Sequence, residues 1–415
     1  MADTFPEILN PGLPPIPHPA TFVGMWIGGQ AKVYRAGDEA LRASRENARM
    51  ARLDPVIAEP LELRIRSTAL RDWVVLCNRD DDEYLFASRI LSRLLAAIPR
   101  ATQLREALLE AIWLGRAAVE LVLDWTTVDG LRLPGVVGWS PIHGDKLVWR
   151  LDSRTGRWDE DGFGIRIAPS AGPVESVATW ITENRGRIET TDFGMAYFPP
   201  PEERQRIIVH RHASQDGEYE EPLRADRVLG TGLRDRLYWI WYHRQQVLRW
   251  VMEFVEKSAL GIELWKYPAG NQSALDALKD AVTRRTSTGK STVFVPVVPG
   301  GPEAQQFGYE RIDPPMAGLE HLAELVTWFD RQIKRMILGQ TLTTEAAPTG
   351  LGSNLADVQA RTFAEIVAYD RRNLEETLTD QLLRRLVTWS LPGIDASAFR
   401  IELQEVADDD GNDAD

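Results

Sequence analysis

Several short motifs in this sequence carry residues that could perform chemistry. Thr288-Gly289-Lys290-Ser291 is similar to the end of a phosphate-binding loop, in which glycine amides and a lysine hold a nucleotide. The first glycine of that pattern would fall at Arg284, which cannot make the turn. A predicted helix also precedes the motif and a predicted strand follows it, so no helix N-terminus is left to hold a phosphate. We predict a plain helix-to-strand turn without nucleotide binding.

Two further groups are candidates for metal binding. His210 and His212 share a face of a predicted strand, but neither a cysteine nor a third histidine lies near them in sequence. The acidic run from Asp80 to Glu83 directly precedes a predicted helix, whose positive N-terminus favours acidic side chains. We predict a solvated or hydrogen-bonded strand end for the histidines and helix capping for the acidic run.

Motifs for hydrolysis are missing from the sequence. It has no serine nucleophile elbow, its six histidines have no evident nucleophile partner, and no acidic pair stands at a known catalytic spacing. We therefore expect no enzymatic activity, no catalytic residue, no metal and no cofactor.

Composition bounds the class of protein. A chain of 415 residues with 44% hydrophobic content can bury two or three packed units. The single cysteine, Cys77, excludes a disulfide within the chain, and we predict a buried, inert thiol in a reducing compartment. No stretch reaches the ~20 apolar residues needed to cross a bilayer, and residues 1–19 lack the pattern of a signal peptide. We expect a protein that is neither exported nor membrane-spanning.

The net charge limits how the chain can meet DNA. The 48 Lys and Arg residues against 61 Asp and Glu give −13. Tight duplex binding needs a basic face that neutralises phosphates, so this balance argues against a repressor-like protein. It remains compatible with DNA as a passing cargo, because every strong phosphate contact along a conduit would be a trap.

The N-terminal half is predicted to mix helices and strands. The proline-punctuated residues 10–17 favour an extended arm, with a disordered tail as an equal alternative. Apolar spacing predicts helices at 61–71, 84–98 and 103–114, and strands at 72–76, 118–125, 146–151, 163–168, 177–181 and 206–210.

The C-terminal half is predicted to be dominated by long helices. One helical stripe is formed by Leu233, Leu237, Trp241, Leu248, Val251 and Val255, and a second by Leu322, Val326, Phe329, Ile333 and Ile337. Between them, strands at 261–267 and 291–298 flank a helix capped by Ser273, which predicts a β-α-β unit. A third helix is expected at 354–391, roughly 50 Å long. It follows a Thr-, Gly- and Ala-rich loop, and residues 408–415 form an acidic, solvated tail.

This order of elements resembles the portal proteins of tailed bacteriophages, and the local motifs are similar to those of their Mu-like branch. The resemblance covers about residues 54–391. Its motifs are residues 337–344 followed by Gly350, Ser353, Val358 and Asp370; Trp241-Tyr242 with Trp250, Phe254, Glu256 and 266–268; and, upstream, 54–57, Arg64 and Trp73. The implied fold class is α+β: a portal fold with an α/β wing, a two-helix stem, a β-α-β clip, a long wing helix, and a minimal or absent crown.

Carried over by position, the resemblance implies the following regions: an extended N-terminal arm (1–38), the wing (39–229), a first stem helix (230–258), the clip (259–317), a second stem helix (318–336), the tunnel loop (337–353), the long wing helix (354–391), and a short crown remnant with the acidic tail (392–415). The implied tunnel-loop residues, which would line the DNA channel, are Gly339, Gln340, Thr341, Thr343, Thr344, Gly350, Gly352 and Ser353. The implied stem residues at the contact between subunits are Leu237, Trp241, Leu248, Val251, Leu322, Val326, Phe329 and Ile333. The implied clip residues for docking are Lys266, Tyr267, Asp276, Lys279, Arg284 and Lys290.

The function that the resemblance implies is structural. The chain would form a ring, a dodecamer in the virion, at one capsid vertex after synthesis in the host cytoplasm, and serve as the DNA conduit for packaging, retention and ejection. Its partners would be the large terminase subunit, the major capsid protein and scaffold, the head-completion adaptor, and double-stranded DNA passing without sequence specificity. Two alternatives stay open: another capsid or neck ring protein, such as an adaptor, and, less favoured, a nucleotide-dependent packaging enzyme.

Two residue patterns fit such a conduit. The hydroxyl side chains of Thr341, Thr343 and Thr344 suit weak, easily exchanged contacts with DNA, although a mobile surface loop has the same composition. The aromatic set Tyr238, Trp239, Trp241, Trp250 and Phe254 covers more than one face of its helix, as contacts within and between subunits require. Aromatic residues on helices also form ordinary cores.

Overall fold

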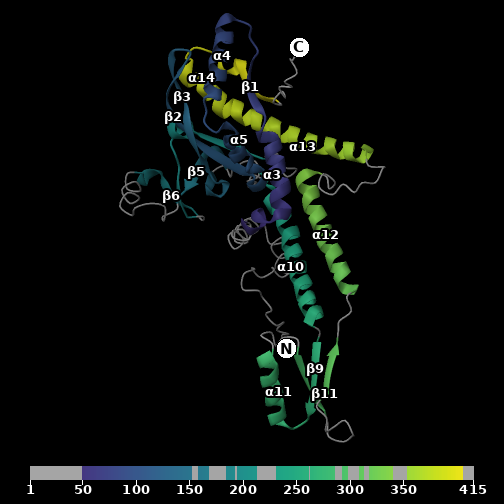
Figure 1. Ribbon diagram of the computed structural model, residues 1–415. Helices are drawn as coiled ribbons and strands as arrows, with labels where there is room; N and C mark the ends of the chain where they lie inside the picture. The colour runs from purple at the N-terminus through teal and green to yellow at the C-terminus, as the bar shows by residue number, and fades with distance from the viewer. Residues whose placement is uncertain are drawn as a thin grey trace. The chain divides into compact units, whose positions relative to one another are not determined.

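The computed structural model describes residues 49–151, 158–167, 184–191, 194–212, 230–260, 262–285, 292–297, 308–312, 317–339 and 353–404 (Figure 1). The chain forms two compact units. Unit 1 contains the residues up to Tyr238 and those from Lys334 onward, and unit 2 is Trp239–Ile333. Unit 2 is thus an insertion into unit 1. The N-terminal arm, the strand expected at 177–181, the turn at 288–291 and the acidic tail lie outside the described residues.

Unit 1 begins with a helix-rich segment. Its elements are α3 (Pro55–Ala69), β1 (Asp72–Cys77), α4 (Asp82–Ala96), α5 (Ala101–Leu109) and α6 (Ala111–Leu114). Asp54 caps α3 by accepting a hydrogen bond from the Val56 amide at 3.1 Å, and Pro55 suits the first helical position. The single helix predicted over 103–114 is in fact two, because the backbone breaks at Glu110.

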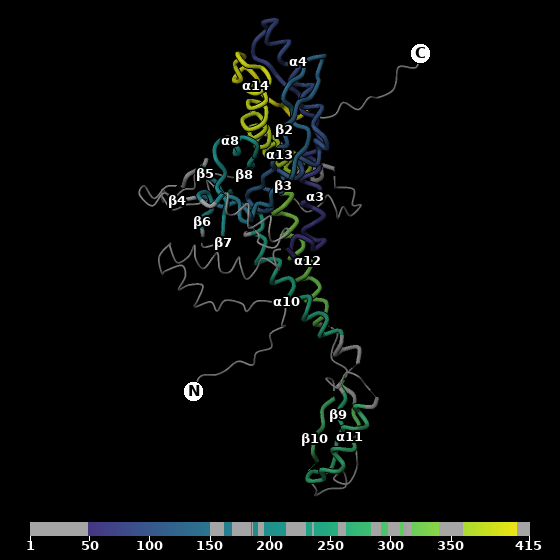
Figure 2. Tube along the Cα trace, turned by 90° about the vertical axis from the view of Figure 1, so that its left-hand side faces the viewer, coloured from purple at the N-terminus to yellow at the C-terminus, as the bar shows by residue number. Residues whose placement is uncertain are grey.

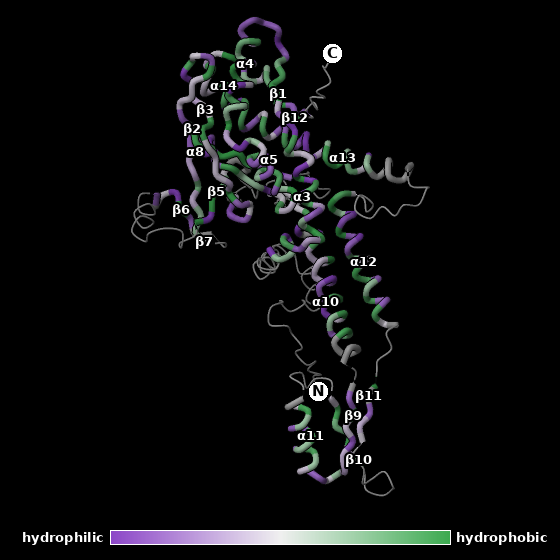
Figure 3. The backbone as a smooth tube through the Cα atoms, in the orientation of Figure 1, coloured by the Kyte–Doolittle hydropathy of each residue, from purple (hydrophilic) through white to green (hydrophobic). Residues whose placement is uncertain are grey.

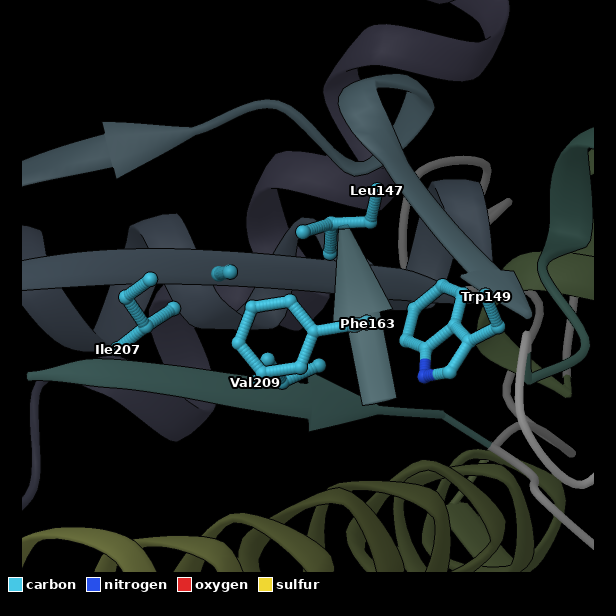
Figure 4. Packing of buried hydrophobic residues seen from close by; sticks show 6 residues of the cluster. Leu147, Trp149, Phe163, Ile207 and Val209 are labelled. Carbon is cyan, nitrogen blue, oxygen red and sulfur yellow. The ribbon is translucent and has the colours of Figure 1, made fainter. Parts of the chain in front are cut away.

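Two sheets follow in unit 1. The hairpin of β2 (Arg116–Val128) and β3 (Leu131–Ile142) turns at Asp129 and Gly130, both of which have positive φ, as a tight hairpin requires. The first sheet has the order β3-β2-β8, with β8 at Ile207–Arg211. The second has the order β4-β5-β7-β6, built from β4 (Leu147–Leu151), β5 (Trp158–Arg166), β7 (Gly194–Tyr197) and β6 (Ile188–Thr191). Figure 4 shows the core that joins the two sheets, formed by Ala118, Leu147, Trp149, Phe163, Ile207 and Val209.

A long helical segment and a final strand complete unit 1. The segment comprises α13 (Ser353–Leu378), a π-helical turn (Thr379–Leu383) and α14 (Arg384–Ser390), which confirms the helix predicted at 354–391. The strand β12 (Phe399–Gln404) was not predicted. It pairs antiparallel with β1, with Asp72 opposite Gln404 and Cys77 opposite Phe399. Cys77 is half-buried there, not buried as predicted.

Polar side chains of α13 and its extension satisfy two strand edges. Along β8, Asn373 donates to the Arg211 carbonyl, Gln381 bonds both backbone groups of Val209, and Arg385 donates to the Ile207 carbonyl, all at 2.8 to 2.9 Å. Along β12, the Ile401 amide donates to Thr379 Oγ1 at 2.9 Å and the Leu403 amide to Glu375 Oε1 at 2.7 Å. The helix therefore occupies edges that would otherwise be open to another strand.

Unit 2 is built on two long helices and a small sheet. Its elements are α10 (Leu233–Leu260, starting in unit 1), β9 (Ile262–Pro268), α11 (Gln272–Arg285), β10 (Thr292–Val297), β11 (Gly308–Ile312) and α12 (Ala317–Leu338, ending in unit 1). The predicted β-α-β unit is confirmed, since β10 runs parallel to β9 with α11 between them in sequence and beside the sheet in space (Figure 2). The strand β11 was not predicted and pairs antiparallel on the other side of β9.

Two predicted helix caps are wrong in detail. Asn271, not Ser273, caps α11, because its Oδ1 accepts from the Ala274 amide at 3.0 Å. Asp81 occupies the N-cap position of α4 but makes no capping hydrogen bond, while Asp82 and Glu83 lie in the first turn, where the helix dipole favours them. No helix in the described part of the chain is long and apolar enough to cross a membrane.

Candidate functional site

The two long helices of unit 2 lie side by side (Figures 1 and 2). Arg244 of α10 forms an ion pair with Asp330 of α12, and Gly318 packs closely against the Phe254 ring. Both helices alternate hydrophobic and hydrophilic residues along their length (Figure 3). Each therefore has one face for its partner helix and other faces for different surroundings.

Large apolar side chains remain exposed on these helices. Trp250 is 54% exposed and Trp328 is 51% exposed, and three aliphatic residues accompany them: Met252, Val255 and Leu325. We call these five residues the exposed apolar set. Exposed tryptophans of this size are candidates for an interaction site, because leaving apolar area in water is unfavourable.

The residues predicted for the contact between subunits fall into two classes. Leu237, Trp241 and Ile333 are buried within the chain, so they have almost no surface left for a neighbour. The half-buried members are Leu248, Val251, Leu322, Val326 and Phe329. The periodicity located the apolar positions but could not tell which of them the chain covers itself. Of the exposed apolar set, the sequence patterns included Val255, in the first helical stripe, and Trp250, in the aromatic set, and they missed the other three.

The sheet of unit 2 presents mixed polar and aromatic groups. The rings of Trp265 and Tyr309 meet edge to face at 4.9 Å, and both donate a hydrogen bond to Glu263. Of the predicted docking residues, Lys266 is partly exposed and pairs with Glu310 at 3.2 Å, and Tyr267 is half-buried. Asp276 and Lys279 are exposed on α11, whereas the side chains of Arg284 and Lys290 lie outside the described residues.

A buried ion pair lies where α12 ends, inside unit 1. Arg64 of α3 donates to both carboxylate oxygens of Asp370 of α13, from Nε at 2.6 Å and from Nη2 at 2.9 Å. Its third nitrogen, Nη1, donates to the carbonyl of Ile337 at 2.9 Å. The Asp370 side chain is 0% exposed. Both residues belong to the motifs noted in the sequence, but nothing in the sequence predicts that they pair across 306 positions.

Gly339 terminates α12 in a conformation that suits glycine. Its φ is +72°, and a Cβ at this position would lie 2.7 Å from Ile366 Cδ1 and 3.0 Å from Thr362 Cγ2 on α13. The chain end of α12 thus packs directly on α13. The other residues predicted for the tunnel loop, Gln340 through Gly352, lie outside the described residues, and Ser353 begins α13.

The two histidines of β8 lie next to this ion pair. His212 Nδ1 is 3.7 Å from Asp370 Oδ1, and His210 Nδ1 is 2.8 Å from Thr377 Oγ1. Burial lowers the pKa of both to about 3, helped by His212 in the case of His210 and by the Arg64 charge in the case of His212. Both rings are therefore neutral at pH 7, and the short distance from His212 to Asp370 is not an ion pair. The predicted hydrogen-bonded strand end is confirmed for His210, in a buried setting.

In the described part of the chain, no group of three or more His, Cys, Asp or Glu side chains is arranged to hold a metal ion.

Comparison with known proteins gives matches of two kinds. A family model described as the portal protein of Mu bacteriophage matches residues 46–414. Three solved structures are similar in fold. The neck of an empty GTA particle, computed with C6 symmetry, has 12% identity over 86% of this chain and 82% of that one, with a TM-score of 0.47. An HK97 family phage portal protein from Corynebacterium diphtheriae has 12% identity over 84% and 94%, with a TM-score of 0.41. The virion of a native gene transfer agent particle has 11% identity over 86% and 82%, with a TM-score of 0.44. No curated protein matches the sequence.

Proposed function

The chain belongs to the family of portal proteins of Mu bacteriophage, and from this premise we propose that copies of it close into a ring that conducts DNA through one vertex of a capsid. The observation that carries the proposal is the family match over residues 46–414, which covers most of the chain. The ring would be a dodecamer in the virion and would have no catalytic activity of its own.

The exposed apolar set supports the ring. Two exposed tryptophans and their aliphatic neighbours on α10 and α12 need a partner, and a second copy of the same chain is the partner that a ring supplies. In a cyclic ring each subunit offers one surface to the next copy and a different surface to the previous one, so two faces of the helix pair must be covered. The stem would therefore be held by the exposed apolar set together with the half-buried Leu248, Val251, Leu322, Val326 and Phe329, while Leu237, Trp241 and Ile333 form its internal core.

The sheet and α11 of unit 2 are the proposed docking region. Asp276 and Lys279 are exposed and of opposite charge, and Lys266 is half-exposed beside Glu310. Such a mixed polar surface suits partners that exchange during assembly, because rim charges set orientation and rate more than affinity. We assign to it the large terminase subunit during packaging and the head-completion adaptor afterwards. The major capsid protein and scaffold would contact the ring elsewhere.

The channel itself is assigned to residues 337–353. Gly339 is its first residue after the end of α12, and the Thr, Gly and Ser composition of the segment suits weak contacts with a passing duplex, without sequence specificity. ATP hydrolysis would belong to the terminase partner. DNA would pass during packaging, be retained, and leave in ejection through the same hole.

Cryo-electron microscopy of the purified full chain tests the proposal directly. We expect closed rings with an axial hole, with α10 and α12 of neighbouring subunits in contact and residues 340–352 facing the axis. A monomer at micromolar concentration, a ring without a hole, or residues 340–352 on the outer rim would each contradict it.

A further inference from the structure

The end of α12 is held at one defined place on α13. Its last turn contributes the Ile337 carbonyl, which accepts from Arg64, and the following Gly339 packs against Thr362 and Ile366 of α13. Arg64 also donates two hydrogen bonds to the Asp370 carboxylate. One planar guanidinium thus joins three elements, α3, α12 and α13, that are remote in sequence.

The energetics of this contact favour a single geometry. A bidentate arginine–carboxylate pair fixes direction as well as distance, because both N–H groups must lie in the plane of the carboxylate. Burial sharpens the preference, since Asp370 has no exposure to water and any displacement would leave a charge without compensation. The Ile337 carbonyl belongs to the last turn of α12, where carbonyls have no partner within the helix, so Arg64 also satisfies the helix end.

The surroundings leave little else to hold Asp370. The neighbouring His212 is neutral and 3.7 Å away, and its ring also meets the Tyr369 ring edge to face at 6.1 Å. Water does not reach the carboxylate. In the described part of unit 1, Arg64 is thus the cation paired with Asp370, and the same side chain bonds the end of α12.

We infer that the Arg64–Asp370 pair is a positioning device, which fixes the last turn of α12 against the middle of α13 and so sets the point from which the chain leaves α12. The inference concerns geometry inside one subunit and stands without a ring. Its consequence for a DNA channel rests on the proposed function, because the end of α12 marks the start of the channel lining only if the chain forms the proposed ring.

Distance measurements between spin labels test the inference on the full chain. The labels are placed at the exposed positions Arg335 on α12 and Ala364 on α13, as R335C and A364C, in a C77S background that removes the only native thiol. Labelled subunits are diluted with unlabelled ones, so that distances within one subunit are observed. We expect one narrow distance distribution for the parent protein.

Three variants separate positioning from stability. Asp370→Asn keeps the shape of the side chain, and Arg64→Lys keeps the charge but loses the planar fork; both should broaden or shift the distribution. The double variant R64Q/D370N carries no buried charge, so it remains informative if a single variant does not fold. The matched control is R79Q/D395N, which removes an exposed pair at 3.2 Å that joins segments equally remote in sequence and should leave the distribution unchanged.

The distance distribution and the melting temperature together distinguish a positioning role from a purely stabilising one. If the folded variants melt at lower temperature but keep the narrow parental distribution, the pair only stabilises the fold and the inference is overturned. Ring formation is followed separately by mass photometry. A broadened distribution in a chain that never forms rings would support the positioning role and contradict the proposed function.

Discussion

Replacing Trp328 with glutamine should weaken ring closure without unfolding the subunit. The side chain is 51% exposed in the single chain. A tryptophan buries roughly 200 Å² when fully covered, so about 100 Å² remains for a neighbour to cover. At about 25 cal/mol per Å², that area is worth roughly 2.5 kcal/mol for each contact between subunits. Trp328→Gln should therefore weaken each contact by up to about 60-fold, since about 1.4 kcal/mol corresponds to tenfold.

The fold of the subunit should tolerate this change. Glutamine is a good helix former, and the internal contact that is lost is the edge-to-face pair with Phe329 at 5.1 Å. Such pairs contribute about 1 kcal/mol beyond their buried area, which is within the margin of a stable domain. Circular dichroism should show unchanged helix content, with a slightly lower melting temperature.

Mass photometry across a dilution series is the appropriate assay. We expect the midpoint of ring dissociation to move to higher protein concentration for Trp328→Gln and for Trp250→Gln, and further for the double variant. Trp125→Gln is the matched control, because Trp125 is 58% exposed but lies on the β2–β3 hairpin of unit 1. Coincident dissociation curves for the parent and the double variant would refute the assignment of this surface to the ring contact.

Three further predictions concern Gly339, the buried histidines of β8, and Lys290. Gly339→Ala should lower the free energy of unfolding by about 1–2 kcal/mol or more, because it combines a left-handed backbone with a Cβ placed 2.7 Å from Ile366 Cδ1; thermal denaturation measures it, and an unchanged melting temperature would contradict the packing described. The pKa of about 3 for His210 and His212 lies below the usual 6.5, so the unfolded state binds more protons between these values and stability falls as pH drops from about 6.5 toward 3. In urea denaturation, His212→Gln should reduce the slope of the unfolding free energy against pH by up to about 1.4 kcal/mol per pH unit. Equal slopes for the parent and His212→Gln would argue that the His212 imidazole is not buried in its neutral form. Finally, Lys290→Ala should not change the ATP turnover of the purified chain from background in a phosphate-release assay, whereas turnover that depends on Lys290 would revive the packaging-enzyme alternative.

Local patterns predicted most elements because their causes are local. The stripes from Leu233 and Leu322 and the run from Asn354 each form a helix, and the strand-like residues 72–76 form β1. Among the described residues, five strands escaped prediction: β3, β6, β7, β11 and β12. For β11 and β12, which are short, what makes them strands is the partner across the sheet, respectively β9 and β1, which no local window contains.

The candidate sites divide in the same way. Helical periodicity marked Trp241 and Ile333 as apolar, and the resemblance implied a contact between subunits for them; their burial within the chain follows from packing across the fold, which no local pattern contains. Arg64 and Asp370 stood out as motif residues, yet their pairing depends on how α3 and α13 meet. The family resemblance, by contrast, needed only the order of elements and the motifs, and the match over residues 46–414 confirms it.

The pairing of β1 with β12 has a consequence for biosynthesis. Residues 72–77 leave the ribosome more than 300 residues before their partner at 399–404 has been translated. At about 5–20 residues translated per second, β1 stays unpaired with β12 for tens of seconds. Unit 2 is translated in this interval, and its strands pair with one another. The β1–β12 sheet therefore forms only after residues 399–404 have been translated. A polypeptide terminated before residue 399 lacks the strand that pairs with β1, so β1 keeps an open edge in it.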